Sequence, residues 1–187
     1  VRHRTQLPVN GVYPHVPVGA FVAPSATITG DVMIGLDAAV WYNAVIRGDK
    51  NKVVVNREAS IGDRAALLTV ESLDSGFPAV MEVDSYAIIR PGATLVSCVV
   101  QQRAVIGENA VVMEGALVEA DAEVGANSVV PPGRRIPSGE HWAGNPAQYV
   151  GPAKEYKVPD QSAEAYAKTD HEGAYYINGT AFTQQAK

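Results

Sequence analysis

The sequence predicts an all-β fold, a parallel β-helix built from hexapeptide repeats, and two observations lead to this prediction. β-Branched aliphatic residues occupy every sixth position from Ile106 to Ile136. A small residue stands two positions before each of the first five, from Ala104 to Ser128. A helix would place apolar residues every three or four positions and a half-buried strand would alternate, so neither explains this period. A period of six is typical of a solenoid whose repeats each form one short strand and one turn.

The same period continues through most of the chain towards the N-terminus. The frame of Ile106 extends back through Val100, Thr94 and Ile88. A second frame comprises Val16, Val22, Ile28, Ile34, Val40 and Ile46, and a third comprises Val55, Ile61, Leu67 and Leu73. The frame slips by three residues after Arg47-Gly48-Asp49, and roughly residues 71–81 are expected to project from the coil as a loop. A β-sandwich whose strands begin with Val or Ile is the alternative fold.

Three segments follow from this pattern. Residues 1–15 carry two prolines and no ladder, so they are expected to form an extended N-terminal arm. Residues 16–150 form the β-helix domain. The Pro- and Gly-rich stretch from Pro131 to Ala147 ends the coils, and Trp142 is expected to cover the open end of the core. Residues 151–187 form a tail that is partly helical, with Asp160 as the cap of a helix that reaches about Thr169. The apolar segment Ala174-Tyr175-Tyr176-Ile177 is expected to pack on a neighbouring surface.

Composition excludes several classes of function. The formal net charge of −5 and the lack of a basic run argue against nucleic acid as a partner. No apolar run approaches the roughly 18 residues of a membrane span. The single cysteine, Cys98, excludes an internal disulfide and falls at a small-residue position, so we expect a buried hydrophobic side chain.

Two motifs make the chain similar to the gamma-class carbonic anhydrases over roughly residues 16–150. One is the segment from Val40-Trp41 to Arg47-Gly48-Asp49, and the other is the Ile136-Pro-Ser-Gly-Glu-x-Trp-x-Gly-Asn-Pro-Ala terminus of the coils. The terminus alone is shared with hexapeptide acyltransferases. Residues 113–119 and 130–140 most resemble the carbonic anhydrase-like subunits of plant- and alga-type mitochondrial complex I. The resemblance implies that the β-helix is left-handed and that it assembles as a trimer.

In the gamma class, three histidines hold zinc at the interface between two subunits. The resemblance places Leu68, Pro91 and Val96 at the three ligand positions, and none of them can donate a lone pair to zinc. Gly62 replaces the glutamine of the motif, and Asp63 remains, but a carboxylate without its metal has no bound water to activate. We expect all four histidines to lie outside the coils, with His3 and His15 on the N-terminal arm, His141 on the end cap and His171 in the tail. We therefore expect no catalytic residue, no metal ligand and no cofactor in this chain.

The resemblance predicts a non-catalytic structural or assembly subunit of the carbonic anhydrase-like heterotrimer on the matrix side of mitochondrial complex I (NADH:ubiquinone oxidoreductase). The chain would be peripheral to the inner membrane, and its partners would be two related subunits and proteins of the membrane arm. Arg47, Asp49 and Asp63 are expected at the subunit interface, although a solvated surface pair would also explain Arg47 and Asp49. Two of the three interfaces would include this chain, so the trimer would hold at most one zinc, bound by the partner subunits.

The sequence is also compatible with two other functions. One is an active enzyme, either a gamma-type carbonic anhydrase or a hexapeptide acyltransferase, in which His141 would be the general base. Glu140 is its neighbour in sequence, but adjacent side chains in an extended segment point apart. The other is a free homotrimeric scaffold or small-molecule binder.

Overall fold

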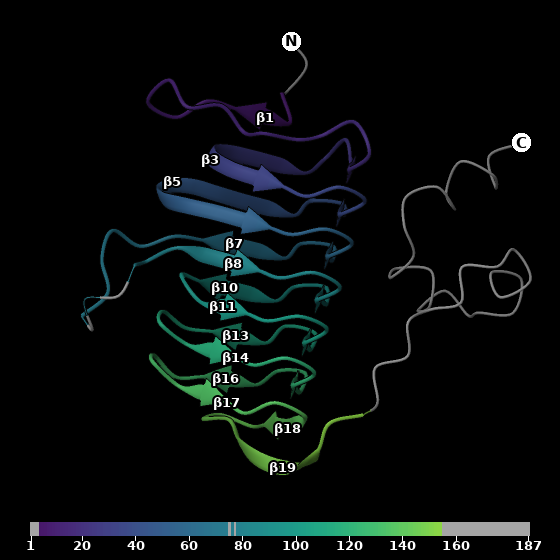
Figure 1. Cartoon of the computed structure of the whole chain (residues 1–187), viewed down its shortest axis with the longest axis vertical. Coiled ribbons are helices and arrows are strands. Elements are labelled where there is room, and N and C mark those ends of the chain that lie inside the picture. The colour runs from purple at the N-terminus through teal and green to yellow at the C-terminus, as the bar shows by residue number, and fades with distance from the viewer. Residues whose placement is uncertain (1–3, 75, 77, 155–187) are drawn as a thin grey trace, which may run out of the picture.

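The computed structural model describes residues 4–154 except 75 and 77, and within them the chain is an all-β parallel solenoid (Figure 1). This confirms the fold class predicted from the period of six. The coils stack along one axis, with the N-terminal coil at one end and the β18–β19 hairpin at the other. Within the same residues, no helix is long and apolar enough to cross a bilayer.

The strands form three faces, which we name by their order along each coil. The third face is an eight-stranded sheet in the order β19-β18-β15-β12-β9-β6-β4-β2. The first and second faces belong to one 11-stranded sheet, because β3 and β5 are long enough to run round the corner between them: β5 pairs with β7 through Val45 and Ile46 and with β8 through Val53 to Val55.

The strand bounds are as follows. The first face begins with β1 (Gln6–Leu7), and the first and second faces share β3 (Thr27–Ile34) and β5 (Val45–Val55). The first face continues with β7 (Ala66–Leu68), β10 (Thr94–Val96), β13 (Val111–Val112) and β16 (Val129–Val130). The second continues with β8 (Met81–Val83), β11 (Val99–Val100), β14 (Leu117–Val118) and β17 (Arg135–Ile136). The third comprises β2 (Phe21–Val22), β4 (Ala39–Val40), β6 (Ser60–Ile61), β9 (Ile88–Ile89), β12 (Val105–Ile106), β15 (Glu123–Val124), β18 (Glu140–Ala143) and β19 (Gln148–Pro152).

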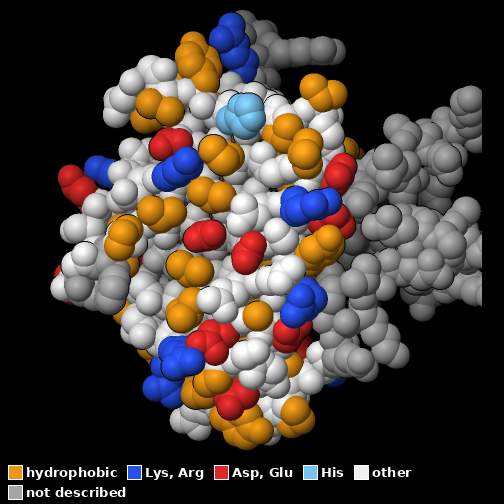
Figure 2. Space-filling view, in the orientation of Figure 1, with side chains coloured by type: hydrophobic (Ala, Val, Ile, Leu, Met, Phe, Trp, Pro, Cys, Tyr) orange, Lys and Arg blue, Asp and Glu red, His pale blue; other side chains and the backbone are white. Residues whose placement is uncertain are grey.

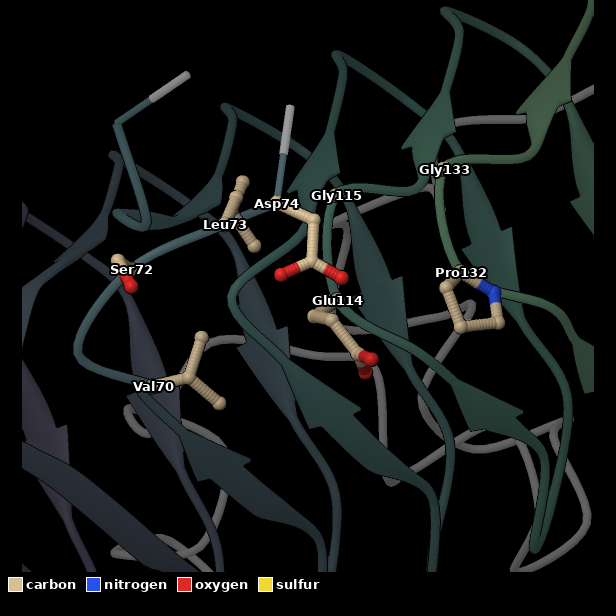
Figure 3. Close-up of a pocket in the computed structure, with 8 residues that line it drawn as sticks. All are labelled: Val70, Ser72, Leu73, Asp74, Glu114, Gly115, Pro132 and Gly133. Carbon is tan, nitrogen blue, oxygen red and sulfur yellow. The ribbon is translucent and has the colours of Figure 1, made fainter. Parts of the chain in front are cut away.

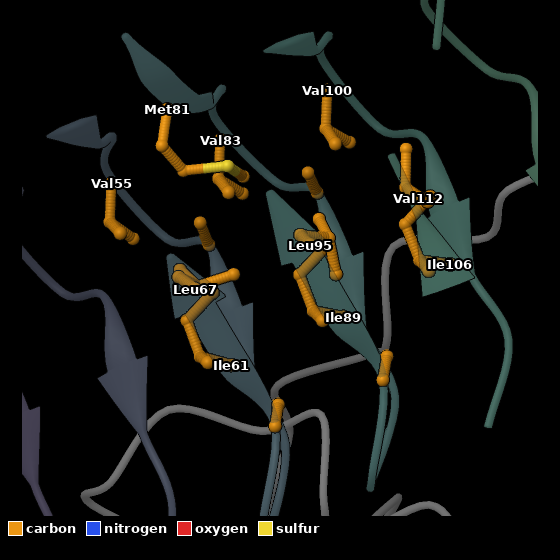
Figure 4. Close-up of a cluster of buried hydrophobic side chains, with 14 of the residues drawn as sticks. Val55, Ile61, Leu67, Met81, Val83, Ile89, Leu95, Val100, Ile106 and Val112 are labelled. Atoms are coloured by element: carbon orange, nitrogen blue, oxygen red, sulfur yellow. The ribbon is translucent and has the colours of Figure 1, made fainter. Parts of the chain in front are cut away.

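The predicted ladder forms the core. All six residues from Ile106 to Ile136 in the period of six are fully buried, and the small residues two positions before them are buried at the corners. Ile106 pairs with Val124, one coil of three hexapeptides later. Figure 4 shows the rungs from neighbouring coils in contact along the axis. The core is therefore a column of aliphatic side chains one residue wide on each face.

Three ladder assignments were wrong. Leu95 and Ile89 point inwards in place of Thr94 and Ile88, because the turn at Ser97 is one residue shorter than the others. Leu95 consequently pairs with Val112, 17 residues later instead of 18. Leu73 lies in the projecting loop, so the third frame ends at Leu67.

The three-residue slip of the frame is a bulge in β5. Gly30 pairs with Gly48 and Val32 with Val53, so four residues of β5, 49–52, lie opposite Asp31 alone. The two glycines allow the backbones of β3 and β5 to approach closely before the bulge, since a Cβ on Gly48 would overlap the carbonyl of Asp31. The glycine of the Arg-Gly-Asp sequence is thus a requirement of strand packing.

Both ends of the solenoid are covered within the chain. Residues of the expected N-terminal arm form β1, which pairs with β3, and a hairpin closes between Val9 and Val12. At the other end, β18 and β19 are antiparallel and Trp142 packs against the core, as expected for the closing residue. The helix expected from Asp160 to about Thr169 lies outside the described residues.

Candidate functional site

The first face carries an apolar surface, from β7 to β16, at the positions where the resemblance places the zinc ligands of the family. Its outward side chains are partly exposed and alternate with buried core residues along each strand. In β5 they are Val45 and the exposed Arg47, and from β7 to β16 they are Ala66, Leu68, Thr94, Val96, Val111 and Val129. The second face carries Glu82 and Arg135 at the equivalent positions, and the third carries Glu123 and His141.

Leu68 and Val96 lie side by side on this face. They are paired in the adjacent parallel strands β7 and β10, which places their Cα atoms about 4.8 Å apart. Pro91 lies in the turn after β9, at the corner between the third and first faces, where its nitrogen packs over Gly62. The structure therefore groups two of the three positions on one face and leaves the third on a corner.

These residues do not form a metal centre. Aliphatic side chains and proline offer no lone pair, whereas zinc sites are built from thiolates, imidazoles and carboxylates. Among the described residues, no group of three or more His, Cys, Asp or Glu is arranged to hold a metal ion.

Asp63 has a structural contact within its own chain. Its Oδ1 accepts a hydrogen bond from the backbone N–H of Tyr42 at 2.9 Å, and its carbonyl accepts one from Gly92 N–H at 2.8 Å. Asp63 therefore ties together three successive turns of the corner between the third and first faces.

Arg47 and Asp49 form an ion pair with each other at the start of the bulge, with Nη2 2.5 Å from Oδ2. Partial burial raises the pKa of Asp49, but the hydrogen bond and charge of Arg47 outweigh it, so the pKa lies below the ordinary value. The Arg47 side chain is 55% exposed, so the pair is worth about 1 kcal/mol or less in this chain. Whether a partner subunit contacts the pair remains a prediction.

Hydrogen bonds fix the base of the projecting loop to the bulge and to the next coil. Ser97 Oγ accepts a bond from Val70 N–H at 2.9 Å and donates to the Ala79 carbonyl at 2.7 Å, so one buried hydroxyl holds both ends of the loop. Thr69 Oγ1 accepts from Asn51 N–H at 3.2 Å, and Asn51 Nδ2 donates to the Val70 carbonyl at 2.7 Å. The period of six did not predict this role of Ser97, although the one-residue slip of the ladder falls at the same turn.

A groove of about 340 Å³ lies between this loop and the corner that joins the first and second faces. The loop contributes Val70 and residues 72–74, and the corner contributes Glu114, Gly115, Pro132 and Gly133. Asp74 and Glu114 direct their carboxylates into the same space (Figure 3). No histidine or cysteine lines the groove, so it offers neither a thiol nor an imidazole to activate the hydroxyl of Ser72.

His141, the candidate general base, lies on the third face in β18. Glu140, its neighbour in sequence, accepts a hydrogen bond from Trp142 Nε1 at 2.8 Å, which agrees with the expectation that it points away. Glu123 on the adjacent strand lies 3.3 Å from His141 Nδ1, without hydrogen-bond geometry. Cross-strand pairing, which adjacency in sequence does not reveal, brings these two side chains together.

Cys98 is buried at its corner, as predicted, with its thiol 3.7 Å from Met81 Sδ. Burial raises the pKa of this thiol to about 12, so it is not a nucleophile at neutral pH.

Comparison with curated proteins identifies the family. Gamma carbonic anhydrase 1, mitochondrial, of Arabidopsis thaliana is 37% identical over 168 residues, which cover 89% of this chain and 61% of that protein. Gamma carbonic anhydrase-like 1, mitochondrial, of the same plant is 44% identical over 147 residues, covering 79% and 58%. The chain belongs to the gamma carbonic anhydrase-like family. It spans about three fifths of the length of these relatives.

Other comparisons concern the fold of this gamma carbonic anhydrase-like chain. No protein-family model matches it. A hexapeptide transferase family protein from Anaplasma phagocytophilum is 28% identical with a TM-score of 0.75, and the match covers 98% of each chain. A putative acetyltransferase of Bacillus cereus has a TM-score of 0.76 over 97% of this chain and 98% of its own, but at 24% identity it supports the fold alone.

Proposed function

We propose that this gamma carbonic anhydrase-like chain is a non-catalytic structural or assembly subunit of a heterotrimer, and that a related subunit packs against its first face. The observation that carries the proposal is the absence of charge from the outward strand residues of that face between Ala66 and Val129. Leu68 and Val96, which stand where the family places zinc ligands, lie on the first two strands of this charge-free stretch, β7 and β10. The surface that would hold metal in an enzyme is suited here to an apolar contact with a neighbouring subunit from which water is excluded.

The physical argument rests on how protein interfaces are built. The buried centre of an interface is depleted in charged residues, whereas free protein surface usually carries them. The other two faces of the solenoid follow the usual rule, with Glu82 and Arg135 on one and Glu123 and His141 on the other. Arg47 and Asp49 lie at the edge of the first face, and the exposed guanidinium retains donors for a partner. We place Asp63 at the same interface, on the corner that would meet the neighbouring subunit.

The proposed location is the matrix side of the mitochondrial inner membrane, on complex I. The names of the Arabidopsis relatives describe them as mitochondrial. The assignment to complex I is supported by the likeness of residues 113–119 and 130–140 to subunits of that complex. Its partners would be two related gamma carbonic anhydrase subunits and proteins of the membrane arm. Any zinc would be held by those two subunits, at most one per trimer.

Native mass spectrometry with metal counting, on the trimer released from its membrane fraction, tests the proposal. A heterotrimer with one zinc or none supports it. Two or three zinc ions per heterotrimer, or a homotrimer of this chain with stoichiometric zinc, would overturn it.

A pair of substitutions on one coil tests the interface directly. Val96→Lys places a charge on the first face, and Val99→Lys places the same charge on the second face, three residues along; both side chains are partly exposed. A buried unpaired charge costs about 3–5 kcal/mol, so Val96→Lys is expected to weaken the trimer by about 100-fold or more. The proposal fails if both variants assemble equally well.

Zinc-dependent hydration of carbon dioxide is the alternative, since relatives as similar as gamma carbonic anhydrase 3, at 46% identity over 149 residues, are named as carbonic anhydrases. This chain would then need ligands that its coils lack. Hydration activity in a preparation of this chain alone, removed by a chelator and restored by zinc, would establish the alternative.

A further inference from the structure

Exposed apolar side chains concentrate at the N-terminal end of the solenoid. Of the eight large hydrophobic residues that are exposed among those described, five fall within the first 36 residues. Tyr13 is 71% exposed and Leu36 is 59% exposed, while Val18 is fully exposed. Together with Val12 and Met33, these residues form what we call the N-terminal apolar patch. Hydrophobic side chains are spread over the whole face seen in Figure 2, and several of them lie at the N-terminal end.

Two contacts bring members of the patch together in pairs. His15 N–H donates to the Val32 carbonyl at 2.8 Å, which lays the segment that follows Tyr13 alongside Met33. Leu36 Cδ2 lies 3.6 Å from the Cβ position of Gly19, directly after Val18. An apolar surface of this kind usually marks a binding surface.

We propose that the N-terminal apolar patch is covered by Ala174-Tyr175-Tyr176-Ile177 of the same chain. This segment carries no charge and offers two tyrosines and an isoleucine. Tyrosine suits such a site because its ring buries apolar area while its hydroxyl stays in contact with water.

The length of chain beyond the described core supports an intramolecular contact. The described core ends at Lys154, whose N–H lies 3.4 Å from Glu123 Oε2 at the opposite end of the solenoid. The third face has six strand steps from β18 to β2, which at about 4.8 Å each amount to about 29 Å. Ala174 lies 20 positions after Lys154. A flexible chain of that length has an r.m.s. span of about 25 Å, or about 23 Å with the helix expected from Asp160 to Thr169 formed.

A linker whose r.m.s. length matches the distance between two sites gives the highest effective concentration, in the millimolar range. A second copy of the chain would have to compete from its much lower free concentration. The inference is independent of the proposed function, because Met33 lies on the second face and the patch does not include the first face.

Thiol cross-linking measures which surface the segment occupies. The first variant carries Val18→Cys and Ile177→Cys, and the matched control carries Tyr149→Cys and Ile177→Cys, with Tyr149 exposed at the end where the tail begins. Cys98 is buried and stays in place in both. A bismaleimide is added to dilute protein, and the rate of the intramolecular product is read by mass spectrometry.

The two outcomes differ in sign. Without docking, Tyr149→Cys reacts faster, because it is nearer along the chain to position 177 and closes a smaller loop. With docking, Val18→Cys reacts about tenfold faster than the control. A tenfold ratio corresponds to about 1.4 kcal/mol, which partial burial of one tyrosine side chain in the patch provides. Adding Tyr175→Ser and Tyr176→Ser is then expected to restore the order of the undocked chain. Faster reaction at Tyr149→Cys, products that link two chains, or no effect of the serine substitutions would each overturn the proposal.

Discussion

Replacing Ser97 by alanine removes the hydroxyl that holds both ends of the projecting loop. The Ser97 side chain is 1% exposed, and its Oγ bonds Val70 N–H at 2.9 Å and the Ala79 carbonyl at 2.7 Å. Each buried polar group left without a partner costs about 1–3 kcal/mol. Ala79 is buried whereas Val70 is half-buried, so water can satisfy only one of the two groups well. We therefore expect Ser97→Ala to favour opening of the loop base by about 2–4 kcal/mol.

Hydrogen exchange is the most direct assay, because the opening is local. A cost of about 2–4 kcal/mol corresponds to exchange roughly 30- to 1000-fold faster at the Val70 amide. Amides of β13 and β14, further along the solenoid, are expected to change little. Ser72→Ala is the matched control, since Ser72 is exposed on the same loop. The reasoning is refuted if exchange at Val70 rises by less than about threefold, or if Ser72→Ala has the same effect.

Three further predictions concern other parts of the solenoid. Gly48→Ala is expected to lower the free energy of unfolding, measured by urea denaturation, by more than about 3 kcal/mol, because the new Cβ would overlap the carbonyl of Asp31 on the facing strand. Gly151 has open space around it, so Gly151→Ala is expected to change the free energy of unfolding little. The double variant Leu68→His, Val96→His places two imidazoles on adjacent strands and is expected to bind zinc measurably in calorimetry, where the unmodified chain does not; equal binding by both chains would contradict this. The hydrogen bond and charge of its arginine partner lower the pKa of Asp121 from 3.8 despite partial burial, so its contribution to stability is present above about pH 4 and is lost as pH falls through the lowered pKa. Asp121→Asn should therefore flatten the acid limb of the stability profile, by less than about 1 kcal/mol because the pair is partly exposed, and an unchanged acid limb would count against this.

The sequence predicts the solenoid well because its core repeats. One branched aliphatic per hexapeptide identifies the strand, the face and the neighbouring coil at once, as Ile106 and Val124 illustrate. The errors fall where a turn changes length. A turn shortened by one residue at Ser97 moves every earlier rung by one position, and because strands alternate, the assigned residue then faces outwards. Thr94 and Ile88 fit the period but face solvent for this reason.

The site was less accessible to sequence reasoning. The substituted positions Leu68 and Val96 could be found by resemblance, but only strand register shows that they are adjacent. The absence of charge from the outward residues of β7 to β16 was hidden for the same reason, since these residues are spread from Ala66 to Val129. Contacts between coils, such as His141 with Glu123, join residues one whole turn apart in sequence.

The projecting loop also shows how a solenoid accepts foreign sequence. Leu67 and Leu95 pair as neighbours even though the loop separates them by more than one ordinary coil, so the inserted residues leave the alignment of the coils unchanged. Its two ends meet at a single hydroxyl, and the entropy of closing such a loop grows by only about 0.6 kcal/mol for each doubling of its length. This corner is consequently a suitable insertion site for protein engineering. A whole folded domain inserted between Val70 and Ala79 would project from the side of the solenoid, and the coils on either side would still stack in register.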